Sequence, residues 1–266
     1  MTGRFEGRRV VVVGSGFGID GVEDIGRASA VAFAAEGAEV AIIQVSQESA
    51  DECVNQITDA GGIVRSFVND PRDLTQIQRI ADEIAADWTS IDVLVTHHFA
   101  TVYGGIDNTT VEAFEETVRV NLSGAFVATK AFLPALRASS FHAAIVHAGS
   151  IDGTLGNPNI PAYSASKGGV HALIHCLAGE LAAEGIRVNG IARAGSSAMP
   201  LPEEALRELD HATPLRPVGD PDEYAAAILF LASDAASYVT GAILPVDGGR
   251  TAVTPAVSPR YAGYDS

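Results

Sequence analysis

Short apolar runs alternate with longer amphipathic segments along almost the whole chain. The runs are rich in valine, isoleucine and alanine, and each is short enough to be a strand. Because both faces of such a run are apolar, it is typical of a strand in a parallel sheet that is covered on both sides. Strands are predicted at residues 10–13, 39–43, 64–68, 92–95, 143–147, 186–191 and 242–246.

The intervals between these runs repeat apolar positions with helical spacing. Helices are predicted at residues 25–36, 47–60, 74–88, 111–120, 121–137, 162–183 and 221–232. Strands that alternate with helices indicate βαβ units, whose right-handed crossovers build a doubly wound sheet. We therefore predict one α/β domain over residues 1–266, a Rossmann-like parallel sheet with helices on both faces and a ligand crevice at the carboxyl ends of its strands. The tail, about 252–266, is predicted to be irregular or to pack on a neighbouring subunit.

Composition and charge narrow the classes of function. Asp and Glu total 33 against 17 Lys and Arg, a formal net charge of −16, so the surface repels nucleic-acid phosphates and anionic lipid headgroups. No apolar run approaches membrane-spanning length, and the first ten residues lack the apolar core of a signal peptide. Cys53 and Cys176 have no metal-ligand spacing and are expected to be reduced packing residues. We expect a cytoplasmic protein with no nucleic-acid partner, no membrane and no metal site.

A glycine-rich turn follows the first predicted strand, beginning with Gly14, Ser15 and Gly16. Glycines at a strand-to-helix turn let backbone N–H groups approach a pyrophosphate, which the N-terminus of the next helix stabilises. Many such turns need glycine only for its backbone freedom. The position after the first strand of a βαβ series favours the dinucleotide site.

A tyrosine and a lysine, Tyr163 and Lys167, lie four residues apart on one face of a predicted helix. A tyrosine has a pKa of about 10, too high for ready proton exchange near neutrality, and a nearby ammonium favours its ionised form. The pair is therefore suited to acid/base chemistry. Ser150 lies thirteen residues before Tyr163, at the end of a predicted strand. Most single pairs of this spacing are only a solvated helix face, so the surrounding pattern must decide.

That pattern resembles the classical short-chain dehydrogenase/reductase family over about residues 8–252. The matching stretches are YSASKGG at 163–169, HAGS at 147–150, VNL at 120–122, GIRVN at 185–189, VTG at 239–241 and VDGG at 246–249. Together they are specific to the family and much less so to a substrate.

The resemblance implies roles for single residues. Tyr163 would be the acid/base, and Lys167 would lower its pKa and bond the nicotinamide ribose. Ser150 would orient a carbonyl, and Asn121 would hold a water that relays protons. NAD or NADP would contact Gly14, Ser15, Gly16, Ile25, Gln44, Asp70, Pro71, His97, Tyr163, Lys167, Arg193 and Ser196. The expected substrate is a small secondary alcohol or ketone, and the expected assembly is a homotetramer or homodimer.

Three regions depart from the family pattern. Gly14 and Gly26 lie twelve residues apart, about twice the usual gap, and residues 19–24 between them bring three acids close to the expected phosphate site. THHF at 96–99 replaces the family's NNAG, and Arg193-Ala194 replaces its PG. His97 and His98 point opposite ways if the segment is extended, so we expect them to contact the cofactor or pack rather than bind a metal.

The cofactor and substrate preferences stay open. Gln44 can bond a ribose hydroxyl but does not repel a 2′-phosphate as a carboxylate would. The threonine that usually bonds the nicotinamide amide aligns with Ala198, which Ser196 or Ser197 would replace. Arg193 would bind an acidic substrate, a cofactor phosphate or a local carboxylate.

The segment at residues 195–214 is short and has few apolar residues, Met199, Leu201 and Leu206, which predicts an open or small lid and a compact substrate. The pocket is expected to include Phe99, Tyr103, Thr154 and Leu155. The apolar surface of Val170, Leu173, Ile174 and Leu177 faces either a second subunit or the sheet.

Two other functions are considered. One is a family-like protein whose weakened cofactor binding leaves it a non-catalytic binding protein. The other is non-redox, dehalogenase-like chemistry, although the related halohydrin dehalogenases use arginine where Lys167 stands.

Overall fold

Seven parallel strands form one sheet in the computed structural model, which describes residues 3–16, 25–199 and 201–253. The spatial order is β3-β2-β1-β4-β5-β6-β7. The strands are β1 (Arg9–Gly16), β2 (Glu39–Gln44), β3 (Ile63–Val68), β4 (Val93–Phe99), β5 (Ala144–Ser150), β6 (Arg187–Arg193) and β7 (Ile243–Val246). The order reverses between β1 and β4, which opens a crevice at the carboxyl ends of the strands. The predicted doubly wound α/β fold is confirmed.

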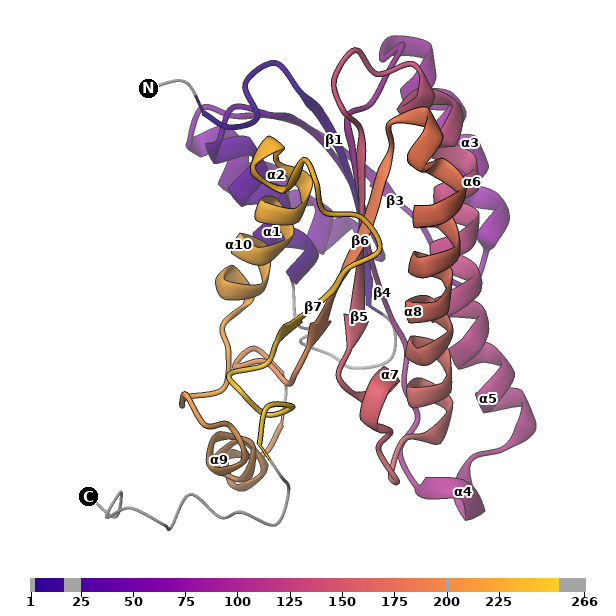
Figure 1. Ribbon diagram of the computed structural model, residues 1–266, viewed down its shortest axis with the longest axis vertical. Coiled ribbons are helices and arrows are strands. Elements are labelled where there is room, and N and C mark those ends of the chain that lie inside the picture. The colour runs from indigo at the N-terminus through magenta and orange to yellow at the C-terminus, as the bar shows by residue number, and fades with distance from the viewer. Residues whose placement is uncertain (1–2, 17–24, 200, 254–266) are drawn as a thin grey trace.

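Helices cover both faces of this sheet (Figure 1). On one face lie α1 (Ile25–Ala35), α2 (Gln47–Asp59) and α10 (Pro221–Ala232); on the other lie α3 (Leu74–Asp87), α6 (Gly124–Arg137) and α8 (Pro161–Leu181). Alternate residues of β1 pack into the two helical layers. Val10 and Val12 pack toward α1 and α10. Val11 and Val13 pack toward α3 and α6. A strand buried on both faces must be apolar at every position, which explains the continuous valine run.

The shorter elements lie mostly at the carboxyl end of the sheet. They are α4 (Gly105–Asn108), α5 (Val111–Val118), a π-helical turn (Arg119–Ser123), α7 (Asp152–Leu155), α9 (Glu203–Ala212) and the 3-10 turns Ala182–Glu184 and Asp234–Ala236. The sequence did not predict α9, because its apolar positions are few. The two helices predicted at 111–120 and 121–137 are joined without a break through the π-helical turn.

β1 and β4 are both longer than predicted. Gly14–Gly16 continue the ladder beside residues 97–99 of β4. The glycine-rich segment therefore begins as strand rather than turn. The acidic residues at 19–24 lie outside the described residues.

The apolar stripe of α8 faces the sheet. Val170, Ile174 and Leu177 are buried in the core, and Leu173 packs against its edge. This resolves the choice between sheet and subunit contact in favour of the sheet. The expectation for the cysteines was half wrong, because Cys53 is buried and Cys176 is exposed. In the part of the chain that the structure describes, no helix combines the length and apolar character needed to cross a membrane.

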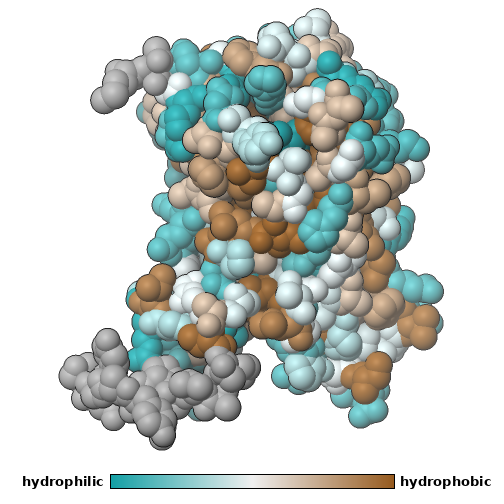
Figure 2. Space-filling view, in the orientation of Figure 1, coloured by the Kyte–Doolittle hydropathy of each residue, from teal (hydrophilic) through white to brown (hydrophobic). Residues whose placement is uncertain are grey.

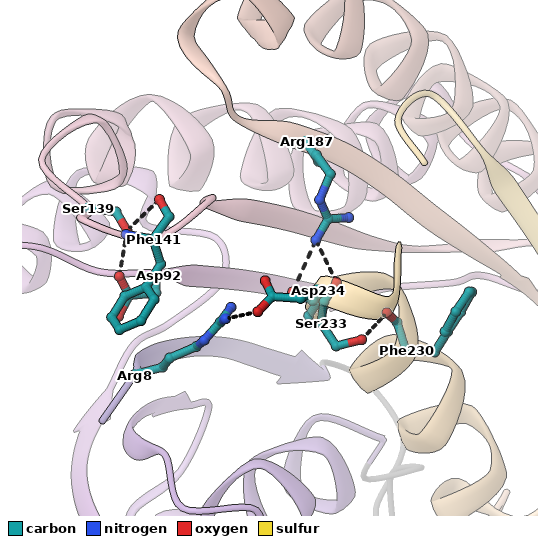
Figure 3. A network of polar contacts seen from close by, with 9 residues as sticks. Arg8, Asp92, Ser139, Phe141, Arg187, Phe230, Ser233 and Asp234 are labelled. Carbon is teal, nitrogen blue, oxygen red and sulfur yellow. Dashed lines mark hydrogen bonds and ion pairs between the residues drawn. The ribbon is translucent and has the colours of Figure 1, made fainter. Parts of the chain in front are cut away.

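Two arginines tie α10 to the amino-terminal edge of the sheet (Figure 3). Arg187, at the start of β6, donates to the carbonyls of Leu231, Ala232 and Ser233 at 2.6, 3.1 and 3.1 Å. A guanidinium suits this place because the last carbonyls of a helix lack partners within the helix. The Arg8 guanidinium pairs with Asp234 at 2.6 Å just beyond the same helix.

Candidate active site

A cavity of about 520 Å³ opens at the carboxyl ends of β4, β5 and β6, between the start of α8 and the α9 segment. Figure 1 shows α9 near the carboxyl end of the sheet, separate from the helices that cover its faces. The predicted lining is half correct: Phe99 and Tyr103 line the cavity, whereas Thr154 and Leu155 are not part of its wall.

The lid is more apolar than predicted. Met199 and Leu201 line the cavity, but Leu206 is not part of its wall. Instead α9 contributes Ala205, Leu209 and Ala212.

Tyr163 and Ser150 lie in the wall of this cavity. Ser150 is the last residue of β5, and its Oγ accepts a hydrogen bond from the backbone N–H of Asp152 at 3.1 Å. Tyr163 lies in the first turn of α8, which begins at Pro161 with a fixed φ suited to a first helical position. The tyrosine side chain is buried, with 3% of its surface exposed.

Lys167 lies one turn beyond Tyr163 and is 1% exposed. Its Nζ donates to the carbonyls of His98 and Ala148, both at 2.8 Å, so the ends of β4 and β5 fix the ammonium. The Nζ atom is 5.7 Å from the centre of the Tyr163 ring. At that distance in a buried site, an ammonium stabilises a phenolate relative to a neutral phenol.

Asn121 lies in the middle of the π-helical turn, an irregularity often found at functional sites. Its Nδ2 donates to Ala100 O and Ser166 Oγ, both at 2.9 Å, and its Oδ1 accepts from Ala100 N at 2.7 Å. The side chain therefore joins the segment after β4 to α8. Its role as a water-holding residue stays a prediction.

The two glycines of the stretched loop remain in contact. A Cβ at Gly14 would lie 3.3 Å from Gly26 Cα and 3.5 Å from the Gln44 Oε1 atom. Only a glycine lets β1 approach the start of α1 and the end of β2 this closely. Gln44 is the last residue of β2 and is buried.

Asp70 lies two residues beyond the end of β3. The Arg72 guanidinium binds its carboxylate through Nε at 2.9 Å and Nη2 at 2.7 Å, and this contact lowers the pKa of Asp70. Arg72 was missed, although its spacing of two residues from an acid in a turn was a usable signal. Pro71, between them, is buried.

Four buried histidines surround the lysine. Burial, then the Lys167 charge, lowers the pKa of His98 to about 3 and the pKa values of His147 and His171 to about 4. Burial and next the Arg193 charge hold the pKa of His97 well below its usual range. These rings are neutral near pH 7. Across residues 3–16, 25–199 and 201–253, no cluster of three His, Cys, Asp or Glu side chains has the arrangement of a metal site.

Phe99 and Arg193 form a stack with the tyrosine. The Phe99 ring meets the Tyr163 ring edge-on, with their centres 5.5 Å apart. The Arg193 guanidinium lies 5.5 Å from the centre of the Phe99 ring, and its Nη1 donates to Ala194 O at 3.0 Å. Arg193 is 3% exposed and pairs in register with Ser150 across β5 and β6. Ser196 is fully buried, and its Oγ accepts from Ala198 N.

Three charged residues of the cavity were missed from the sequence: Glu208 on α9, Asp152 and Arg250. Burial raises the pKa of Asp152, although the charges of Arg250 and Arg193 act in the opposite direction. The sequence offered only weak signals for two of them. Asp152 comes two residues after Ser150, and Arg250 directly follows the VDGG stretch.

Comparison with known proteins places this geometry in a family. A family model described as Enoyl-(Acyl carrier protein) reductase matches residues 18–251. Cis-4-hydroxycyclohexanecarboxylate dehydrogenase of Sinomonas cyclohexanicum is 37% identical over 94% of this chain and 98% of that protein. D-threitol dehydrogenase of Mycolicibacterium smegmatis is 33% identical over 93% of this chain and 94% of that protein. The crystal structure of a short-chain dehydrogenase/reductase from Burkholderia xenovorans has a TM-score of 0.87 at 31% identity, over 95% of this chain and 99% of that one.

The chain belongs to the short-chain dehydrogenase/reductase family. It is an NAD(P)-dependent oxidoreductase acting on alcohol or carbonyl groups. The residues present fit such a cofactor where the structure describes them. The Gly14 contact leaves no side chain between β1 and the start of α1, and Gln44 lies beside it at the end of β2. Phe99 narrows the space beside Tyr163, where the family motif has glycine.

Proposed function

We propose that this short-chain dehydrogenase/reductase interconverts a small secondary alcohol and a ketone, with Tyr163 as the proton donor and acceptor. The observation that carries the proposal is the Lys167 ammonium fixed 5.7 Å from the Tyr163 ring, at a cavity that Ser150 also lines. In the reducing direction the phenol gives its proton to the carbonyl oxygen, and Ser150 Oγ holds that oxygen in place. The resulting phenolate is stabilised by Lys167 until a proton returns.

The nicotinamide cofactor supplies or accepts the hydride, and the protein contributes placement and proton transfer. Tyr163, Lys167 and Ser196 would hold its nicotinamide half, and Arg193 would face the substrate in the same cavity. Gly14, Ser15, Gly16, Ile25, Gln44, Asp70, Pro71 and His97 would hold the rest. By resemblance to the family, Asp70 would contact the amine of the cofactor's adenine. Because Arg72 already binds the Asp70 carboxylate, the amine would share it with the arginine. An amide at Gln44 neither binds nor repels a 2′-phosphate strongly, so both NAD and NADP fit the end of β2.

Relatives named as dehydrogenases of D-threitol and cis-4-hydroxycyclohexanecarboxylate support a small hydroxylated substrate. The cavity volume of about 520 Å³ is in the usual range for a small-molecule site. We further propose that the chain works in the cytoplasm as a homodimer or homotetramer. The apolar band over β7 in Figure 2 supports the assembly, which light scattering would measure.

The test begins with fluorescence and calorimetric titrations of the purified protein with NADH and NADPH, followed by a carbonyl and alcohol panel. Tyr163→Phe removes only the phenol oxygen, and we expect kcat to fall by about 10²- to 10⁴-fold with nucleotide affinity retained. Tyr238→Phe, at a fully exposed tyrosine outside the cavity wall, is the matched control. Undiminished turnover by Tyr163→Phe would disprove the proposal.

The alternative functions have their own outcomes. Nucleotide binding without turnover of any panel compound would favour a binding protein. Halide release from a vicinal haloalcohol without nucleotide would favour dehalogenase-like chemistry.

A further inference from the structure

Two arginines from different parts of the chain line the cavity. Arg193 ends β6 and is buried, whereas Arg250 comes from the turn after β7 and is partly exposed. Burial raises the pKa of Asp152, and both arginines lie close enough for their charges to oppose that rise. The second carboxylate of the wall, Glu208, is on the exposed side of α9.

Two almost fully buried cations lie at the reacting centre. Arg193 lines the cavity, and the Lys167 ammonium lies 5.7 Å from the centre of the Tyr163 ring, which lines it too. The carboxylate of Asp152 is near enough to Arg193 and Arg250 to interact with both charges. The neighbouring His97 responds to this potential, because the Arg193 and Lys167 charges add to burial in lowering its pKa. A chain with a formal net charge of −16 thus places cations around its reacting centre. Such local charge in a low-dielectric cleft attracts anions.

Arg193 lies beside the two residues expected to hold the reacting carbonyl, Ser150 and Tyr163. Its Cα is the register partner of Ser150, and its carbonyl accepts from Ile151 N at 2.9 Å. Its guanidinium packs on Phe99, whose ring touches Tyr163. A carbonyl held between Ser150 and Tyr163 would therefore present its substituents toward this side of the cavity.

We propose that the cavity selects small oxo acids and hydroxy acids, with Arg193 binding the substrate carboxylate and Arg250 adding a second contact. The inference rests on the proposed oxidoreductase function and names its substrate class. A guanidinium is the fitting group because its planar fork matches both oxygens of a carboxylate. The Phe99 ring packs beside the guanidinium, with its centre 5.5 Å away.

The experiment compares each acid with its neutral methyl ester, since the ester keeps the carbonyl and loses the charge. The probes are pyruvate, acetoacetate and levulinate with their methyl esters, assayed at saturating nucleotide. We expect the wild type to prefer at least one acid by about tenfold or more in kcat/KM. Arg193→Met should lower kcat/KM for that acid by about 10- to 100-fold more than for its ester, mainly through KM. Arg193→Lys keeps the charge without the fork and should recover part of the preference.

Arg79→Met removes an equal charge from an exposed site on α3 and is the control. Arg250→Met, at a partly exposed residue, provides a second test if Arg193→Met does not fold. Equal losses for acid and ester would overturn the proposal and leave Arg193 as a partner of Asp152. A weaker nucleotide affinity in place of the acid-specific loss would assign the arginine to a cofactor phosphate, which also overturns it.

The experiment distinguishes failure of the proposed oxidoreductase function from failure of the carboxylate inference. If no carbonyl compound is turned over, calorimetric titration with levulinate still compares wild type and Arg193→Met. Binding that depends on Arg193 but not on Arg79 would support the carboxylate site. Absence of binding to the wild type, together with no acid preference, would disprove it. Turnover of the esters with no acid preference would disprove the inference while the oxidoreductase proposal stands.

Discussion

At the scale of single residues, the buried histidines make the stability of the fold depend on pH. His98, His147 and His171 have pKa values of about 3, 4 and 4, all far below the value near 6.5 of an exposed imidazole. The folded chain therefore keeps them neutral at a pH where the unfolded chain protonates them. Their contribution to stability is complete above about pH 6.5 and is lost as the pH falls toward the folded pKa values.

We expect the free energy of unfolding to fall between about pH 6.5 and pH 4, by up to about 1.4 kcal/mol per pH unit for each such histidine. His147→Gln, which can keep the contact to Thr96 Oγ1, should reduce this slope by about one histidine's share. Urea unfolding at several pH values measures it, with the exposed His175→Gln as control. A slope that His147→Gln leaves unchanged would contradict the assignment.

At the scale of the element, the amino terminus of α10 connects the core to the cavity. The Asp220 carboxylate accepts from Asp222 N at 3.1 Å, and Glu223 Oε2 accepts from Asp220 N at 2.8 Å, in a capping box. The same Asp220 accepts from Ser197 Oγ at 3.1 Å, just after the segment that leaves β6. One carboxylate thus caps a helix and fixes part of the loop that leads to the lid.

Asp220→Ala removes both contacts, and we expect it to lower the free energy of unfolding by about 1–2 kcal/mol. Asp220→Asn keeps an oxygen that can cap the helix, so its loss should be only a few tenths of a kcal/mol. Chemical unfolding followed by circular dichroism compares the two. Equal losses would show that the charge, rather than the cap, carries the effect.

At the scale of the whole molecule, the two ends of the sheet have different tasks. The carboxyl ends of the strands form the cavity, while the arginine contacts of Figure 3 hold the amino ends to α10. Burial lowers the pKa of Arg187, although the charge of Asp234 opposes that shift. Stability and chemistry can therefore be changed separately.

Arg187→Met leaves the carbonyls of the α10 end without this donor, and we expect a loss of about 2–3 kcal/mol in the free energy of unfolding. The kcat of the folded variant should stay near that of the wild type. Arg137→Met, which breaks an exposed pair with Glu184, should cost less than about 1 kcal/mol and is the control. Urea unfolding and initial rates measure both; a kcat loss as large as that of a cavity variant would contradict this separation.

Much of the fold could be predicted because its causes are local. The valine run of β1 and the helical spacing of α8 report burial directly, and most predicted boundaries differ from the observed ones by a few residues. The pairing of Tyr163 with Lys167 also follows from local geometry, since residues four apart share a helix face. Where the apolar signal was weak, as in α9, the prediction failed.

The sequence by itself determined the doubly wound sheet and the helical face that carries Tyr163 and Lys167, because periodicity and spacing act within a few turns. Only the tertiary structure decided which other residues reach that face. Phe99, Asp152, Arg193 and Arg250 come from different elements and meet through strand register and the packing of β4, β5, β6 and β7. Such contacts join positions up to about 150 residues apart, so no local pattern encodes them. The chemistry is therefore readable along the chain, whereas the charge that would choose the substrate depends on the fold.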